Sequence, residues 1–207
     1  MRRILTSALG AWERALLLGL CAAMLCGVWA QGRQRALAGD LIRLHVVAAS
    51  DSPGDQAVKL AVRNAVLSLA GEALDGASGP EEAEELLRRR LPELARTASE
   101  ISGGQARASL GQEYYPTREY ETFSLPAGRY TSLRITLGEG GGRNWWCVVY
   151  PPLCVQPVEE VRQTASLTED DIKLITGDGE GYVIRFRILE WWNALAERWD
   201  KKAQSGG

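Results

Sequence analysis

The chain has 207 residues, of which 24 are basic, 26 are acidic and 45% are hydrophobic, and its formal net charge is -2. This length and apolar content are sufficient to bury the core of one domain. The near-neutral balance excludes a strongly basic surface for phosphate backbones, so nucleic acid is not an expected partner.

The first thirty residues have the layout of an export signal. A basic start, Met1 to Arg3, precedes the apolar run Ala15 to Ala30, which ends in small residues before polar Gln31. We therefore predict that residues 1–30 are an export signal or membrane anchor, with a cleavage site after Ala30. The run is shorter than the roughly 20 residues that span a membrane, which favours a cleaved signal over an anchor. In either case the rest of the chain lies outside the cytoplasm, and membrane contact is confined to this segment.

Residues 31–39 are polar and predict a linker, so we expect the folded domain to cover residues 40–200, followed by a polar tail, 201–207. The apolar run 41–47 predicts a buried strand. Ser52, Pro53 and Asp55 form a helix start signature, because the side chains cap free amides and proline has none to cap. A stripe at helical spacing then predicts a helix to Leu74; its members are Val58, Ala61, Val62, Ala65, Val66 and Leu69.

A second helical pattern covers residues 81–101 and is interrupted at Pro92. Glu84 and Glu85 each precede an arginine by four residues, which predicts ion pairs on a solvated face rather than an interaction tail. We expect Pro92 to open a second short helix. Its buried side would carry Leu94, Ala98 and Ile101.

The second half of the chain changes to strand periodicity. Alternation over residues 106–111 and 130–137 predicts antiparallel strands, and Gly138 to Gly142 predicts a hairpin loop that lacks the lysine of a phosphate-binding loop. Residues 155–178 have turn signals only, 182–187 alternate like a strand, and a stripe through Trp192 predicts a terminal amphipathic helix. The expected fold class is α+β, with an N-terminal strand and helices, an antiparallel sheet in the second half and a C-terminal helix.

The stretch NWWCVVYPPLC, residues 144–154, holds two of the four cysteines; the other two lie in the export signal. In an oxidising compartment, Cys147 and Cys154 are a candidate disulfide, which requires the intervening prolines to turn the chain back. Two packed, unbonded thiols are the alternative. These cysteines and one histidine are too few for a zinc site, so we expect no metal and no cofactor.

The tryptophans of this stretch have two interpretations. In a strand, Trp145, Cys147 and Val149 point to one side, whereas Trp146, Val148 and Tyr150 point to the other. Both faces are apolar, so the strand is either buried on both sides or offers one face to a partner, where aromatic side chains concentrate binding energy. The candidate partner-binding residues are Trp145, Trp146, Tyr150 and Trp191.

His45 is the only histidine and lies within the first predicted strand. A hydrolase site could be built from His45 and Asp51, but six extended residues separate them by roughly 20 Å unless the chain folds back. The sequence contains no G-x-S-x-G motif to supply a nucleophile. A structural, hydrogen-bonded histidine is therefore the favoured interpretation.

Three segments of the sequence together resemble a known family. They are LIRLHVVAASDSPGDQAVKLAVRNAV, YYPTREY followed by PAGRYTSLRITLGEGGGRNWWCVVYPPLC, and RILEWW. They are similar to stage II sporulation protein R of endospore-forming bacteria over residues 40–192. Proteins of this family are exported from the forespore into the space between the septal membranes. There they trigger a membrane-bound aspartic protease of the mother cell, which processes the precursor of sigma-E.

The resemblance implies an exported intercellular signal that binds its receptor, is not an enzyme and needs no cofactor. Ala49 departs from the family pattern, in which we expect asparagine. The alternatives are an exported hydrolase acting on cell-envelope material and a structural envelope protein. The family has no established catalytic residues to transfer to this chain, only motif positions that belong to the scaffold or to a shared surface. These motif positions are His45, Ser50, Asp51, Trp145, Trp146, Cys147, Pro151, Pro152 and Cys154.

Overall fold

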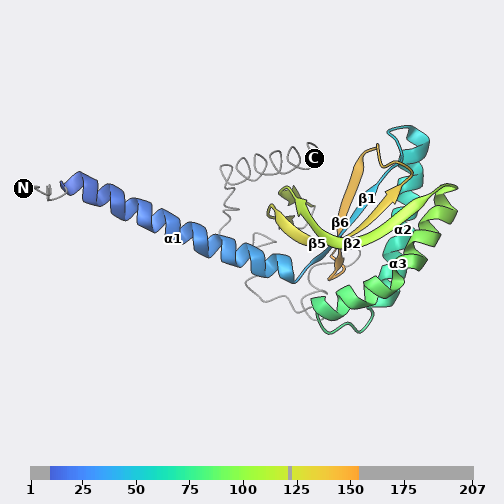
Figure 1. Cartoon of the computed structure of the whole chain (residues 1–207), viewed down its shortest axis with the longest axis horizontal. Coiled ribbons are helices and arrows are strands. Elements are labelled where there is room, and N and C mark those ends of the chain that lie inside the picture. Colours follow the sequence, from blue (N-terminus) through green and yellow to red (C-terminus); the bar gives the residue numbers. More distant parts are fainter. Residues whose placement is uncertain (1–9, 121–122, 154–207) are drawn as a thin grey trace, which may run out of the picture. The chain divides into compact units, whose positions relative to one another are not determined.

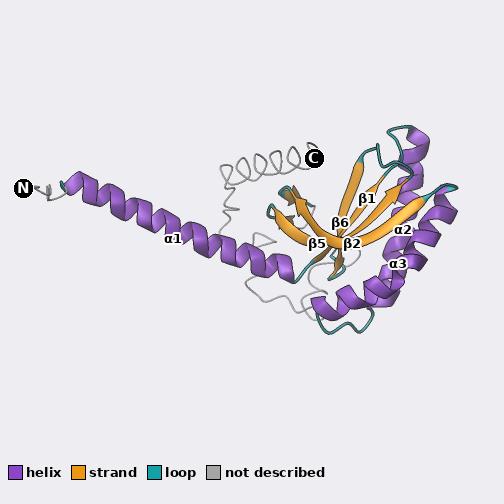
Figure 2. Cartoon of the chain, viewed as in Figure 1, coloured by secondary structure: helices purple, strands orange, loops and turns teal. Residues whose placement is uncertain are grey.

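The computed structural model describes residues 10–120 and 123–153, and these form helices and a mixed sheet (Figures 1 and 2). The α+β class is therefore confirmed. The predicted strand at 182–187, the terminal helix and the polar tail lie outside the described residues. The elements are α1 (Ala11–Gly39), β1 (Ile42–Val47), α2 (Pro53–Leu74), α3 (Pro80–Ser102), β2 (Ala106–Tyr115), β3 (Arg118–Glu119), β4 (Ser124–Leu125), β5 (Gly128–Leu137) and β6 (Asn144–Tyr150).

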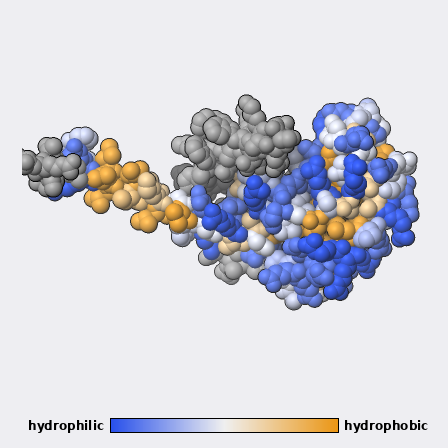
Figure 3. Space-filling view, viewed as in Figure 1, coloured by the Kyte–Doolittle hydropathy of each residue, from blue (hydrophilic) through white to orange (hydrophobic). Residues whose placement is uncertain are grey.

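Helix α1 contains the apolar run and has an 18-residue window of mean hydropathy 1.8, so it is long and apolar enough to cross a membrane (Figure 3). A signal sequence has the same properties. The helix continues through residues 31–39, the predicted linker, and ends at Gly39. Leu37 and Ala38 are buried, and the compact unit begins at Leu37 rather than at Asp40.

The main sheet has the strand order β2-β5-β1-β6. β1 lies in its middle, parallel to β5 and antiparallel to β6, while β2 is antiparallel to β5. This corrects the expectation of an antiparallel sheet built from the second half alone. It also corrects the predicted hairpin at Gly138–Gly142, because β5 and β6 are not neighbours and the loop crosses the end of β1.

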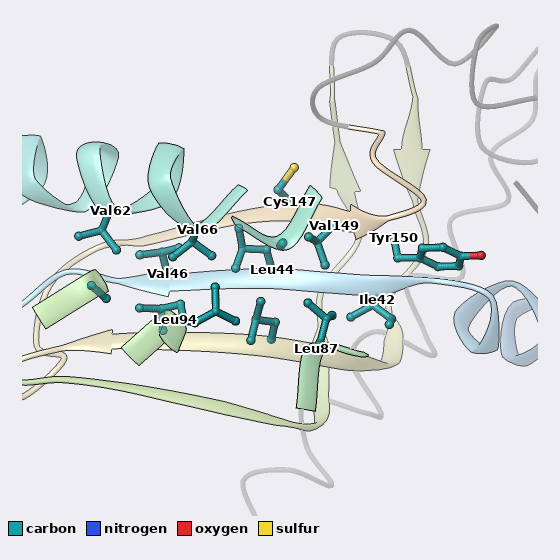
Figure 4. Close-up of a cluster of buried hydrophobic side chains, with 14 of the residues drawn as sticks. Ile42, Leu44, Val46, Val62, Val66, Leu87, Leu94, Cys147, Val149 and Tyr150 are labelled. Atoms are coloured by element: carbon teal, nitrogen blue, oxygen red, sulfur yellow. The ribbon is translucent and has the colours of Figure 1, made fainter. Parts of the chain in front are cut away.

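Helices α2 and α3 cover one face of this sheet (Figures 1 and 4). Leu44 of β1 and Leu87 and Leu94 of α3 are each 0% exposed in the cluster between the two layers. Ser52 caps α2 as predicted, since its hydroxyl accepts a hydrogen bond from the Asp55 amide, and the helix ends at Leu74. The fully buried stripe of α2, however, is phased differently from the prediction, and Ala61 faces outward; the stripe contains Lys59, Val62, Val66, Ala70 and Leu74.

Helix α3 is a single helix, which corrects the expectation that Pro92 opens a second one. Pro92 is exposed, so water can satisfy the Arg88 carbonyl that has no amide partner at position 92. Leu94 and Ala98 are buried as predicted, but Ile101, in the last turn, is 37% exposed. The ion pairs of Arg88 with Glu84 and of Arg89 with Glu85 are confirmed at 2.6 and 3.0 Å.

Replacing Pro92 with alanine is expected to stabilise the protein by about 1 kcal/mol. The gain is smaller than the roughly 3 kcal/mol that separates proline from alanine inside a helix, because this helix has already adapted to the ring. Urea unfolding of both proteins measures the difference. An unchanged or lower free energy of unfolding in the variant would show that the proline costs nothing at this position.

The other face of the sheet carries a second cluster that includes Leu37, Tyr130 and Val148. Leu125 of the short β3–β4 pair and Phe123, which precedes β4, also belong to it. The sheet is therefore apolar on both sides near β6, and Arg43, His45 and Ser132 of this second face are buried.

Candidate functional site

The turn between β1 and α2 is held by the loop that connects β5 to β6. The amides of Gly141 and Gly142 donate to the carbonyls of Ala49 and Ala48 at 3.2 and 3.0 Å. The Arg143 amide donates to Asp51 Oδ1 at 2.7 Å. Three consecutive residues of the β5–β6 loop thus hold the β1–α2 turn in place. The carboxyl end of β1 and the start of β6 therefore form one rigid edge.

A group of cations surrounds this edge. Lys59 of α2 is 6% exposed, and its Nζ donates to Gln56 Oε1 at 2.6 Å and to the Arg143 carbonyl at 3.1 Å. Burial, followed by the charges of Arg143 and Arg63, lowers the pKa of Lys59, while Asp51 opposes the shift. The ammonium therefore lies in a field that is positive on balance.

His45 lies on the sheet face opposite the helices and is 5% exposed. Its Nδ1 and Glu113 Oε1 are 2.9 Å apart, and its Nε2 is 2.9 Å from the side-chain oxygen of Asn144. Ser132 and Arg134 of β5 donate to the same carboxylate at 2.9 and 3.0 Å. Burial raises the pKa of Glu113, but the hydrogen bond and charge of His45, with Ser132 and Arg134, outweigh burial and lower it overall.

This network differs from a Ser-His-acid triad in its connectivity. In a triad the histidine lies between the nucleophile and the acid. Here the carboxylate of Glu113 lies between Ser132 and His45, and Ser132 is only 2% exposed. Asp51 bonds instead to Arg143, so these contacts do not assemble the His45 and Asp51 pair considered for a hydrolase.

Arg43, next to His45 along β1, has no exposed surface. Its Nη2 donates to the Tyr120 hydroxyl at 2.8 Å, and its guanidinium lies 3.9 Å from the Tyr115 ring centroid and 5.0 Å from that of Tyr130. Among the residues that the structure describes, its Nε and Nη1 have no hydrogen-bond partner. The charge is thus stabilised mainly by aromatic rings, and burial raises the pKa of Tyr115.

The two tryptophans of β6 lie on opposite faces of the sheet, and both are half-buried. The Arg63 guanidinium of α2 lies 4.8 Å from the Trp145 ring centroid, and that of Arg118 lies 3.9 Å from the Trp146 ring. Trp146 also contacts His45, with ring centroids 5.6 Å apart. Each tryptophan ring therefore packs against a hydrophobic cluster and is also covered by the guanidinium group of an arginine. The predicted role of Trp145 and Trp146 in partner binding stays a prediction.

Tyr150 is on the other face from the one expected. The register of β6 against β1 shifts between Ile42 and Arg43, so Tyr150 is opposite Ile42 and Val148 is opposite Arg43. This bulge inverts the alternation. Tyr150 consequently packs in the cluster beneath the helices and is 6% exposed, which leaves little of its ring for a partner.

The remaining predicted site residues are placed as follows. Ser50 donates to Asp55 and accepts from the Ser52 amide, so it is a turn residue. Pro151 is buried and Pro152 is half-buried. Cys147 is 0% exposed. Cys154 and Trp191 lie outside the described residues, and the Cys147–Cys154 disulfide stays a prediction.

Several residues of these clusters were not anticipated from the sequence. Glu113 follows the predicted strand 106–111 and lies two residues before Tyr115, and a carboxylate that a strand buries needs a charged or hydrogen-bonding partner. Lys59 interrupts an apolar helix, and a buried ammonium has the same need. The partners themselves are far away in sequence, so pairing could not be inferred; the unanticipated residues are Arg43, Lys59, Arg63, Glu113, Ser132, Arg134 and Asn144.

Comparison with known proteins places the chain in a family. The family model described as stage II sporulation protein R matches residues 38–160. The chain is 32% identical to "Stage II sporulation protein R" of Bacillus subtilis (strain 168) over 176 residues, which cover 72% of this chain and 79% of the relative. No solved structure matches. The matched region contains His45, the β1–α2 turn and the β6 tryptophans. The chain therefore belongs to the stage II sporulation protein R family.

Proposed function

We propose that this protein is an exported signal of sporulation that acts by binding. In this proposal it is secreted from the forespore into the intermembrane space and activates the membrane-bound aspartic protease of the mother cell. That protease then processes the sigma-E precursor. Membership of the sporulation protein R family and the apolar helix α1, which suits a signal or an anchor, support export and signalling.

The observation that most favours binding over catalysis is the state of His45. It is the only histidine of the chain, and both of its ring nitrogens are engaged, Nδ1 by Glu113 and Nε2 by Asn144. A general base needs a nitrogen within reach of the proton it removes. A histidine bound on both sides and 5% exposed supports the sheet instead.

The proposed mechanism is differential affinity. A ligand shifts an equilibrium only by binding one state more tightly than the other, so the signal must prefer the active arrangement of the protease. A preference of about 5.5 kcal/mol would convert a protease that is almost entirely inactive into one that is almost entirely active.

The test is processing of the sigma-E precursor in cells that make the cognate protease with and without this protein. We expect processing only when the protein is present, and its failure in the wild type would refute the proposed function. His45→Gln, which cannot act as the same base but keeps hydrogen-bonding groups, separates the two mechanisms. Binding predicts processing close to the wild-type level once exported amounts are matched, whereas a hydrolase predicts none.

Trp146→Leu tests the aromatic surface in the same cells. Leucine keeps an apolar side chain against the second cluster but removes most of the ring area and the Arg118 contact. If Trp146 meets the receptor, processing should fall about tenfold or more, as for an aromatic residue at the centre of an interface. Normal processing at a normal exported level would remove Trp146 from the contact surface.

A further inference from the structure

The edge formed by α2 and the start of β6 carries more positive than negative charge. The charges of Arg63 and Arg143 both act on Lys59, and Asp51 is the acid that opposes them there. Arg143 Nε is 3.5 Å from Asp51 Oδ1, but the two side chains are 74% and 58% exposed. That contact is therefore weak and open to competition.

Arg63 has no acidic partner in residues 10–120 and 123–153. Its Nε and Nη2 donate to the amide oxygen of neighbouring Asn64 at 2.9 and 2.7 Å, and its face lies over Trp145. A guanidinium is always charged and fits a carboxylate with two parallel hydrogen bonds. The Arg63 charge is therefore held in place by an aromatic ring, and no acidic side chain within the described part of the chain neutralises it.

Apolar surface lies beside these cations. Leu60, on the outward side of α2, is 41% exposed, and Ala57 and Ala61 on the same side are exposed as well. The Trp145 ring is half-buried. A surface that combines an aromatic ring, an unpaired arginine and exposed aliphatic side chains has the composition of a protein interface.

We propose that Arg63, Trp145 and Arg143 form a docking surface for a carboxylate-bearing segment of a partner protein. This inference rests on the proposed function for the identity of the partner, which would be the receptor protease. The segment pairs its carboxylates with the two guanidinium groups and packs an apolar side chain against Leu60. Docking also relieves the repulsion among Lys59, Arg63 and Arg143.

A protein segment fits this surface better than an anionic membrane. Asp51 stands exposed within the group, and the whole chain carries a net charge of -2. A uniformly anionic lipid layer would meet Asp51 as well as the arginines, and that contact is repulsive. A protein segment can place a hydrogen-bond donor opposite Asp51 and carboxylates opposite the cations.

The test is a charge reversal with a matched control. The double variant Arg63→Glu, Arg143→Glu is compared with Arg89→Glu, Arg96→Glu, which changes the net charge equally on α3, where the side chains are 71% and 69% exposed. At equal exported levels, precursor processing should fall about tenfold or more in the first variant and stay near wild type in the second. Equal processing in the two variants would overturn the proposal.

A direct binding measurement keeps the inference separate from the proposed function. The full chain in detergent is titrated with an oligoglutamate peptide and, separately, with glycerol phosphate as the lipid headgroup analogue. We expect the peptide to bind the wild type and the Arg89, Arg96 variant at least about tenfold more tightly than the Arg63, Arg143 variant, and to raise the pKa of Lys59 in an NMR titration.

Two results of this titration contradict the docking surface even when no processing is seen with the wild type. One is equal affinity of the peptide for all three proteins. The other is tighter binding of glycerol phosphate than of the peptide, which would assign the surface to phosphate groups. If processing fails but the peptide still binds selectively, the receptor protease is not the partner. The proposal that this surface binds a carboxylate-bearing protein segment would then remain supported.

Discussion

Gly142→Ala is expected to lower the free energy of unfolding by about 3 kcal/mol. A β-carbon at position 142 would overlap the Ser50 carbonyl oxygen and lie 2.5 Å from the carbonyl carbon, and these backbone atoms cannot move without breaking the β1–α2 turn. The amide of Gly142 also donates to the Ala48 carbonyl. Chemical denaturation followed by tryptophan fluorescence measures the loss.

Gly141→Ala is the matched control, one residue earlier in the same loop. Its β-carbon would lie 3.4 Å from the Ala49 carbonyl oxygen, which is close to ordinary van der Waals contact. Removing a glycine also reduces the entropy of the unfolded chain, so the change should stay within about 0.5 kcal/mol. Equal effects of the two alanines would mean that loop flexibility, rather than the contact with Ser50, sets the stability.

Glu113→Leu is expected to cost about 2 kcal/mol at neutral pH. It leaves the Nδ1 of His45 buried without its acceptor and leaves the Ser132 hydroxyl with only Tyr115 as a partner, and unsatisfied buried groups carry the full cost of lost hydration. Glu93→Leu on α3 is the control, since it removes only the exposed ion pair with Arg90 and should cost less than about 1 kcal/mol.

The cost of Glu113→Leu should depend on pH. The folded-state pKa of Glu113 is below its ordinary value, so ionised Glu113 contributes its stabilisation above about pH 4.3. That contribution disappears as the pH falls through the folded-state pKa. Unfolding curves of both proteins between neutral and strongly acidic pH should therefore converge, and a difference that grows on acidification would contradict the proposed charge network.

Local signals in the sequence predicted the parts of the fold that depend on neighbouring residues. The cap at Ser52 and the first strand are such cases, because capping needs only the next few residues and six consecutive buried positions in β1 leave little ambiguity. The ion pairs of Glu84 and Glu85 on α3 are similar.

The phase of α2 could not be predicted because this helix is apolar on nearly all sides. Lys59 is buried, although it was not part of the predicted stripe, while Ala61, which was part of it, is exposed. Periodicity identifies the inward face only when the outward face is charged, as on α3. The exposed aliphatic residues Ala57, Leu60 and Ala61 on the outside of α2 belong to the surface proposed to meet a partner.

The candidate site was hidden by distance along the chain. His45 was identified, but its partners Glu113 and Asn144 come from β2 and β6, and no local pattern connects them. The position of Tyr150 depended on a single register shift, which alternation cannot reveal. The sequence lacked the order of strands for His45 and the register between β1 and β6 for Tyr150.

That order has a consequence for the timing of folding. β1 is the first strand to be synthesised, but both of its neighbours, β5 and β6, begin only at Gly128 and Asn144. Pairings so distant in sequence form slowly, because a long loop must close before any contact compensates its lost entropy. A chain that crosses a membrane with its N-terminus leading would therefore keep β1 unpaired until β5 had emerged, and would complete the sheet only with β6.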